Sequence, residues 1–390
     1  MHGMRRCSPP VRLLVLASLV LVAATSCGGG SDDGTAADAP TTTTAVPPPA
    51  PTTTTTPPPP TDVYAGTRAG MLADSVRDVP TRVYVPNGHS NTVTVIDPAT
   101  FQVVDVFPVG ALPQHVVPSY DLSTLYVNNN QGNSLTPIDP RTGSPGAPIP
   151  VDDPYNLYFS PDGKYALVMA EREKRIDVRD PSTWALLTSI SVPYAGINHA
   201  DFSADGNTMI ASCEFSGWVV RIDLPTLTVT GQAEVGGEPI DVRIAADGAV
   251  FYVANHVKNG GGVSAIDPAT MTETSFITTG AGAHGLYPSR DGTKLYVTNR
   301  KAGSVSVVDF ATRAVVATWT IAGGGSPDMG GVSADGTQFW VSGRYNDVVY
   351  VFDTTTGALT HTIPVEHGPH GLAIFPQPGR ISLGHTGNYR

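Results

Sequence analysis

Residues 289–313 read SRDGTKLYVTNRKAGSVSVVDFATR, and this stretch contains the pattern that decides the fold. Two runs in it, LYVTN from Leu295 and SVSVVD ending at Asp309, are rich in β-branched and aromatic residues and show period-two alternation. This composition and period predict β-strands. The flanking segments SRDG and DFAT are typical of turns, because an Asp side chain can accept a backbone N–H two residues on and Gly adopts positive φ.

The same pattern occurs seven times along the chain, with a spacing of 41 to 44 residues. The Asp that ends the second run of each repeat is found at Asp97, Asp139, Asp180, Asp223, Asp267, Asp309 and Asp353. The first runs begin at Val83, Leu125, Ala166, Met209, Phe251, Leu295 and Phe339. A third run follows each Asp, and a fourth ends in a second turn such as SPDG at Ser160. Four strands in about 42 residues predict an all-β, seven-bladed β-propeller with four-stranded blades.

Three segments, LYVTN at Leu295, VSVVD ending at Asp309 and PHGLA at Pro369, resemble the YVTN-repeat, YncE-like β-propellers. The similarity covers residues 81 to about 380 and implies the fold but no particular function, since such propellers include binding proteins, lactonases and redox enzymes. By analogy with other propellers, the strand at residues 370–375 is expected to complete the blade that begins at Val83. The segment ISLGH at Ile381 is in register for a further strand and could compete for that place.

The N-terminus predicts export. Three arginines flank the start of an apolar run of twelve residues, Leu13–Ala24, which is shorter than the roughly 20 residues that span a bilayer. This arrangement is typical of a secretory signal. The following Ala24-Thr25-Ser26-Cys27 resembles the lipobox of bacterial lipoproteins, which implies lipidation of Cys27. The alternative is an ordinary cleaved signal that leaves Cys27 as an unmodified thiol.

A Thr/Pro-rich tract separates this signal from the repeats. Residues 40–61 contain ten Thr and nine Pro, cannot bury a core and favour extended PPII structure. We therefore expect a lipoprotein signal peptide at residues 1–26, a disordered tether at residues 27–62 and the propeller at residues 63–390. The predicted location is the outer face of the cell membrane, with the lipid anchor as the membrane contact.

Composition and motifs narrow the function classes. The net charge is −11, and removal of a signal with three Arg and no acid makes it −14, which argues against nucleic-acid binding because no dense basic run offsets it. With Cys7 removed and Cys27 modified, Cys213 has no partner for an intramolecular disulfide. The chain lacks an HExxH, a P-loop, a GxSxG elbow and a CxxCH. These observations favour a binding protein over an enzyme.

Blade geometry predicts a polar cluster at one end of the ring. Strands alternate in direction, so the loop that enters each innermost strand and the loop between the second and third strands share one end, here called the mouth face. The second loop position includes His89, Glu171, Arg172, Cys213, Glu214, His256, Arg300 and Arg344. We predict a ligand site formed by His115, Asn156, His199, Asp241, His284, Asp328 and His370, with Arg300 and Arg344 as anion contacts.

Three interpretations of this cluster remain open. Imidazoles suit a transition metal, with His115, His199, His284 and His370 as candidate ligands. A small molecule, protein or peptide could instead bind at the mouth, where polar groups on a rigid scaffold form the default site. The side chains could also simply fix the loops by hydrogen bonds.

A catalytic role has weaker support. Cys213 lies near His199 in the sequence, but a lone Cys at a strand end is typically a small buried hydrophobe. Residues 197–215 also resemble the haem-binding propellers of nitrite reductases, which implies at most a non-covalent cofactor because CxxCH is absent. The favoured function is an exported, membrane-anchored binding or scaffold protein. The alternative is a metal- or cofactor-dependent redox or hydrolytic enzyme that uses the same face.

Overall fold

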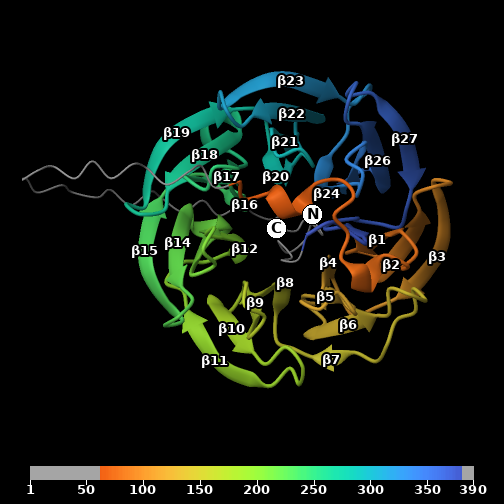
Figure 1. The fold of residues 1–390 in the computed structure, drawn as a ribbon, viewed down its shortest axis with the longest axis horizontal. Helices are drawn as coiled ribbons and strands as arrows, with labels where there is room; N and C mark the ends of the chain where they lie inside the picture. The colour runs from red at the N-terminus through yellow and green to blue at the C-terminus, as the bar shows by residue number, and fades with distance from the viewer. Residues whose placement is uncertain (1–61, 380–390) are drawn as a thin grey trace, which may run out of the picture. The chain divides into compact units, whose positions relative to one another are not determined.

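A computed structural model describes residues 62–379, in which 28 strands form seven four-stranded antiparallel sheets arranged as a ring (Figure 1). This confirms the predicted all-β, seven-bladed propeller with four-stranded blades. The predicted signal peptide, the lipidation site Cys27, the tether up to residue 61 and ISLGH at Ile381 lie outside the described residues. Among residues 62–379, no helix has the length and apolar character needed to cross a membrane.

The blades are numbered here in chain order, and the strands of each are given from the centre outward. Blade 1 contains β28 (Ala373–Phe375), β1 (Arg82–Asn87), β2 (Thr92–Asp97) and β3 (Gln102–Pro108). Blade 2 contains β4 (Pro113–Pro118), β5 (Leu125–Asn129), β6 (Ser134–Ile138) and β7 (Ile149–Pro150). Blade 3 contains β8 (Pro154–Phe159), β9 (Ala166–Ala170), β10 (Arg175–Arg179) and β11 (Leu186–Ser191). Blade 4 contains β12 (Ile197–Phe202), β13 (Thr208–Cys213), β14 (Trp218–Asp223) and β15 (Thr228–Glu234).

The remaining blades follow the same plan. Blade 5 contains β16 (Pro239–Ile244), β17 (Phe251–Asn255), β18 (Gly262–Asp267) and β19 (Thr272–Thr278). Blade 6 contains β20 (Ala283–Pro288), β21 (Lys294–Asn299), β22 (Ser304–Asp309) and β23 (Ala314–Thr320). Blade 7 contains β24 (Pro327–Val332), β25 (Gln338–Gly343), β26 (Val348–Asp353) and β27 (Leu359–Pro364). Four short 3₁₀ helices are η1 (Ala65–Thr67), η2 (Asp74–Val76), η3 (Glu214–Ser216) and η4 (Lys258–Gly260).

The ring closes in blade 1, where the last strand pairs with the first. Strand β28 is antiparallel to β1, with Val83 opposite Ile374. This confirms the expectation that the C-terminal strand completes the blade begun at Val83. The pairing removes the free strand edge that an open array would leave.

The inner strands of each blade are covered on both faces. Strands β5 and β9 are buried along their full length, whereas the outer strand β15 alternates between partly exposed and exposed positions over most of its length. Neighbouring blades supply the cover: Val83 and Val85 of blade 1 pack in one cluster with Trp340 of blade 7. Continuous burial explains why the inner runs are nearly uninterrupted apolar segments.

The end of the ring opposite the mouth face, here called the turn face, carries the SPDG-type turns. In five blades a Ser hydroxyl donates to the Asp two residues on, as Ser160 does to Asp162 at 2.6 Å. The first of these turns, SYDL, was not among those identified in the sequence, because Leu122 occupies the Gly position. Leu122 adopts φ 64° there and is buried against Val76 and Val79.

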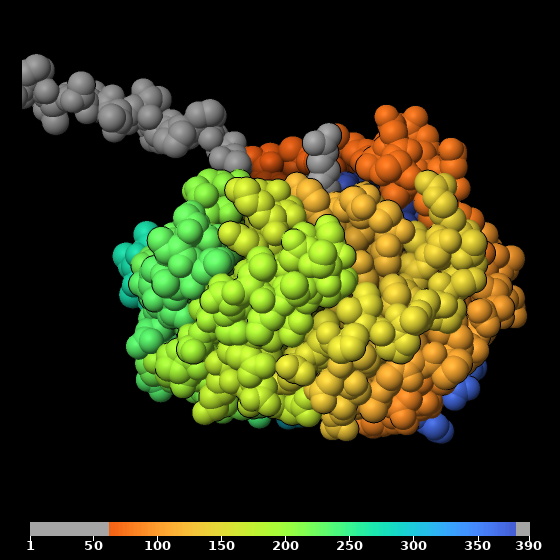
Figure 2. Space-filling view, turned by 90° about the horizontal axis from the view of Figure 1, so that it is seen from below, coloured from red at the N-terminus to blue at the C-terminus, as the bar shows by residue number. Residues whose placement is uncertain are grey.

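An N-terminal segment, residues 62–80, crosses the turn face and is here called the strap (Figure 2, red to orange). The Val63 amide donates to the Ala246 carbonyl at 2.9 Å, and the Tyr64 hydroxyl donates to the Ile244 carbonyl at 2.7 Å. Further along, Arg141 donates to the Ser75 carbonyl at 2.9 Å. The chain therefore enters the propeller at the face opposite the mouth.

Candidate functional site

Asp328, on the innermost strand of blade 7, is the centre of the mouth cluster. Its carboxylate lies 2.7 Å from Nε2 of His284 and 2.9 Å from Nδ1 of His370. The guanidinium groups of Arg300 and Arg344 approach the same carboxylate at 3.2 and 3.6 Å. Blades 1, 6 and 7 thus bring five of the predicted site residues together around one buried acid.

The electrostatics of this cluster follow from burial and from the two arginines. Burial alone would raise the pKa of Asp328, but the hydrogen bonds from His284 and His370 and the positive charge of Arg300 hold it well below its usual range. Burial and then Arg300 lower the pKa of His284 to about 4. Burial and then Arg344 lower that of His370 to about 3. Both imidazoles are therefore neutral near pH 7, and the nitrogen that faces Asp328 carries the proton.

His115 and His199 form a second layer of rings beside this hub. The His115 ring centroid lies 4.8 Å from that of His370, 5.4 Å from that of His199 and 5.3 Å from that of Tyr155. Both histidines are fully buried. Gly371 makes this packing feasible, because a Cβ there would overlap the His115 ring.

Tyr155 joins the two layers. Its hydroxyl lies 3.4 Å from Nε2 of His370, the nitrogen that does not face Asp328. Since that nitrogen is the acceptor in the neutral ring, the phenol is the donor. Burial, followed by the nearby Glu171 and Glu214, raises the pKa of Tyr155 well above its usual value. Tyr155 is therefore a neutral hydroxyl beneath the mouth.

An acid pair lies on the opposite side of the mouth, and the sequence-based site did not include it. One amide nitrogen, Nδ2 of Asn198, donates to Glu171 at 3.1 Å and to Glu214 at 2.6 Å. Both glutamates directly follow a second strand, at the position that Arg300 and Arg344 occupy in blades 6 and 7. This shared position in the repeat could have identified both glutamates as mouth residues. The sequence alone does not indicate that the two acids converge on one amide.

Two predicted site residues make contacts within the blades. Asn156 donates to the Tyr158 hydroxyl at 3.1 Å. Asp241 forms a buried ion pair with Arg243 at 3.0 Å and accepts the Leu286 amide of the next blade at 2.8 Å. The bond between Asp241 and Leu286 links blades 5 and 6, and ligand binding by either site residue stays a prediction.

Among residues 62–379, one group of His284, Asp328 and His370 has the spacing to hold a metal ion, with a ligand atom of each within 4.8 Å of the others. It includes two of the four predicted metal ligands and leaves out His115 and His199. A divalent cation there would compete with the guanidinium groups of Arg300 and Arg344, which already neutralise Asp328. The charge arrangement is thus better suited to an anion than to a metal.

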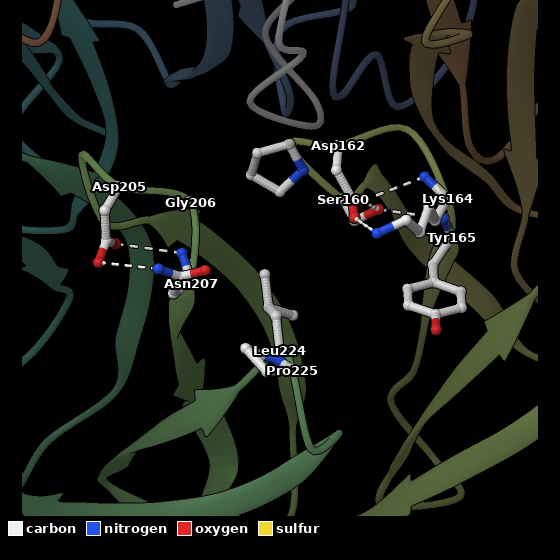
Figure 3. A pocket seen from close by; sticks show the side chains of 10 residues that line it. Ser160, Asp162, Lys164, Tyr165, Asp205, Gly206, Asn207, Leu224 and Pro225 are labelled. Atoms are coloured by element: carbon white, nitrogen blue, oxygen red, sulfur yellow. Dashed lines mark hydrogen bonds and ion pairs between the residues drawn. The ribbon is translucent and has the colours of Figure 1, made fainter.

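A hollow of about 380 Å³ lies on the turn face, between blades 3 and 4 (Figure 3). Its polar lining is paired locally: Lys164 bonds Asp162 at 2.7 Å, and the Asn207 amide donates to Asp205 at 3.1 Å. The same Ser–Asp turn recurs in other blades, so these groups are explained by turn formation.

The fold and the mouth cluster define the chain as a seven-bladed β-propeller with a polar mouth. The YncE-like β-propeller family matches residues 65–379, and the chain belongs to this family. No curated protein sequence matches it significantly.

Solved structures with similar folds are distant in sequence. A functionally unknown protein from Desulfotomaculum acetoxidans DSM 771 is 17% identical with a TM-score of 0.65, over 75% of this chain and 98% of that one. Dihydro-heme d1 dehydrogenase NirN in complex with DHE is 16% identical with a TM-score of 0.59, over 78% of each chain. Hydrazine synthase from Kuenenia stuttgartiensis is 19% identical with a TM-score of 0.55, over 66% of this chain and 87% of that one. At these identities the similarity establishes the fold alone.

Proposed function

We propose that this protein binds a small organic anion at the mouth of the propeller, through Arg300 and Arg344, while a lipid on Cys27 holds it at the outer face of the cell membrane. The observation that carries the proposal is the convergence of two guanidinium groups on one carboxylate. Asp328 balances one of the two charges, and the neutral imidazoles add none. A ligand carboxylate would complete the charge balance and accept the remaining N–H donors.

The arginines are within reach of solvent. Their side chains retain 12% and 17% exposure, whereas Asp328 beneath them has none. The Arg344 guanidinium makes a long ion pair with Asp328, and its buried Nη1 has no hydrogen-bond partner among residues 62–379. An unsatisfied buried donor is costly, so an acceptor from a ligand is favoured at this position.

Apolar side chains beside the mouth residues favour a ligand with an apolar part. Phe215 and Tyr345 are 65% and 66% exposed, and each directly follows a mouth residue, Glu214 or Arg344. Exposed aromatic groups on the same face as charged ones are typical of binding surfaces. We therefore take benzoate as the first probe, with acetate as the comparison that lacks a ring.

Titration calorimetry with benzoate tests the proposal. Wild type should bind benzoate more tightly than acetate, and Arg300→Gln with Arg344→Gln together should weaken benzoate binding at least tenfold. The matched control is Arg313→Gln, because Arg313 lies on the turn face in a loose 3.8 Å ion pair with Asp247. Equal benzoate binding by the double variant and the wild type would refute the arginine site.

The location is tested separately. The described chain begins at residue 62 on the turn face, where Val63 and Tyr64 bond to blade 5. Cys27→Ser should release the protein from the membrane fraction into the medium. Continued membrane association of that variant would contradict lipid anchoring through Cys27.

A metal-dependent enzyme is the second candidate, favoured by the spacing of His284, Asp328 and His370. Elemental analysis of protein purified without a His tag separates the two. Stoichiometric Cu, Zn or Fe that disappears in His284→Ala and His370→Ala variants would replace the anion proposal with this one. A metal-free protein that binds benzoate would support the anion site.

A further inference from the structure

The acid pair at the mouth is held by an amide whose orientation is fixed. The Ser212 hydroxyl lies 3.0 Å from Oδ1 of Asn198, and Nδ2 on the other side of the amide faces the glutamates. Each of its two N–H groups then serves one carboxyl group. Glu171 is buried and Glu214 is half-buried. The amide therefore brings two acids together in a place with little water.

No cation is bonded to this pair among the described residues. Asp153 and Arg172 face Glu171, but Arg172 binds Asp153 at 2.6 Å. The charged groups that act on Glu214 are Arg300, Glu238 and Asp328. The guanidinium group of Arg300, however, forms its ion pair with Asp328, at 3.2 Å. The charges of both acids and of Arg344 also act on Tyr155, which stays neutral because its pKa is raised.

Two unneutralised carboxylates in a poorly hydrated place repel each other, so the pair retains a proton. Burial and then the charge of Glu214 raise the pKa of Glu171 to about 8. Burial raises the pKa of Glu214 to about 7, against the opposing charge of Arg300. Near pH 7 the mouth therefore combines two guanidinium groups with an acid pair that is partly protonated.

An arriving anion changes that balance. An ionised glutamate repels a carboxylate ligand, whereas a protonated one can donate a hydrogen bond to it. Linkage requires that a ligand which favours the protonated pair also draws a proton onto it. We infer that an organic carboxylate binds at Arg300 and Arg344 with uptake of a proton by the Glu171–Glu214 pair. This inference rests on the proposed anion site and adds its regulation by pH.

Calorimetry with benzoate in two buffers of different ionisation enthalpy measures the proton uptake directly. Benzoate remains ionised between about pH 6 and pH 9, so a proton taken up must go to the protein. We expect between about 0.5 and 1 proton per benzoate near pH 8, and an affinity that falls towards tenfold per pH unit above it. The matched variant Glu171→Gln with Glu214→Gln keeps both side-chain shapes and should bind benzoate without proton uptake and with a flat pH profile.

The outcomes separate the inference from the function on which it rests. Wild-type binding without proton uptake, or an unchanged pH profile in the Gln variant, would overturn the coupling and leave the anion site standing. Absence of benzoate and acetate binding in the wild type would overturn the anion site itself. Glu171→Gln alone, with circular dichroism as a check of folding, covers the case in which the double variant does not fold; it should show a reduced proton uptake.

Discussion

The two ends of the propeller use the same repeat in opposite ways. On the turn face, five blades carry the same Ser–Asp hydrogen bond, and each pair is satisfied within its own turn. On the mouth face, the corresponding loops begin with different residues: Glu171, Glu214, His256, Arg300 and Arg344. There the partners come from other blades, as Asp328 shows. The side chains that recur in most blades thus stabilise the fold. The side chains that differ from blade to blade indicate where a ligand would bind.

We expect the largest difference in stability between the two faces when Asp328 is replaced. Replacing it in Asp328→Ala leaves the partly buried Arg300 and Arg344 without their counter-ion, so we expect the free energy of unfolding to fall by about 3–5 kcal/mol. The matched turn-face change Asp205→Ala removes hydrogen bonds near the surface and should cost about 1 kcal/mol. Urea unfolding measures both. Similar losses of stability in the two variants would mean that the ion pairs of Asp328 contribute no more than the hydrogen bonds of a surface turn.

Replacement of a glutamate of the acid pair should give the next largest change in stability. The direction of this change follows from the raised pKa of Glu171. Glu171 binds a proton more tightly in the folded chain, because burial raises its pKa from the usual 4.5 to about 8, so stability falls as pH rises between these two values. Glu171→Gln removes that loss and should stabilise the protein by about 2–3 kcal/mol near pH 8, with little effect near pH 4.

Thermal unfolding across this pH range provides the measurement. Glu234→Gln is the control, because Glu234 is exposed on the outer strand β15 and should leave the pH profile unchanged. A wild-type stability that does not decline between neutral pH and about pH 8 would contradict the buried, protonated state of Glu171.

The sequence predicted the fold because the repeat is carried by local signals. The Asp-terminated runs, their spacing and the SPDG turns each report on strand or turn formation without knowledge of distant residues. Closure by residues 370–375 was predicted by analogy with other propellers, and the pairing of β28 with β1 confirms it. Leu122 was missed since its turn lacks the Gly that marks the others, and packing against the strap holds its positive φ.

The site was only partly accessible from sequence. Topology alone placed His284, His370, Asp328, Arg300 and Arg344 at one end of the ring. Which side chains meet depends on rotamers and on the amides that orient them, and neither has a periodic signature. Asn198 illustrates this: its role as the bridge between two glutamates follows only from the hydrogen bond of Ser212, on the paired strand, to its oxygen.

Substitutions in the strap show whether contacts on the turn face that lie outside the repeats also contribute to stability alone and not to ligand binding. Val76 and Val79 are buried beside Leu122 and Leu125, so Val76→Ala and Val79→Ala should each cost about 1–2 kcal/mol of stability. Because these contacts lie on the face opposite the mouth, benzoate affinity should not change. Denaturant unfolding and calorimetry on the same samples measure the two effects. A loss of affinity equal to the loss from the arginine variants would show that the two faces are not independent.

The smallest effect comes from the turn in blade 5, which lacks the Ser of the other Ser–Asp turns. In blade 5, Ala245 stands where five other blades have Ser, and Asp247 accepts only the Ala249 amide at 3.0 Å among the bonds of its turn. Ala245→Ser should restore the hydroxyl bond to Asp247 and stabilise the protein by about 0.5–1 kcal/mol, while Ser203→Ala should cost a similar amount. Thermal unfolding of both variants suffices. If the added hydroxyl destabilises the protein, its burial outweighs its hydrogen bond, and the turn chemistry is less interchangeable between blades than its repetition indicates.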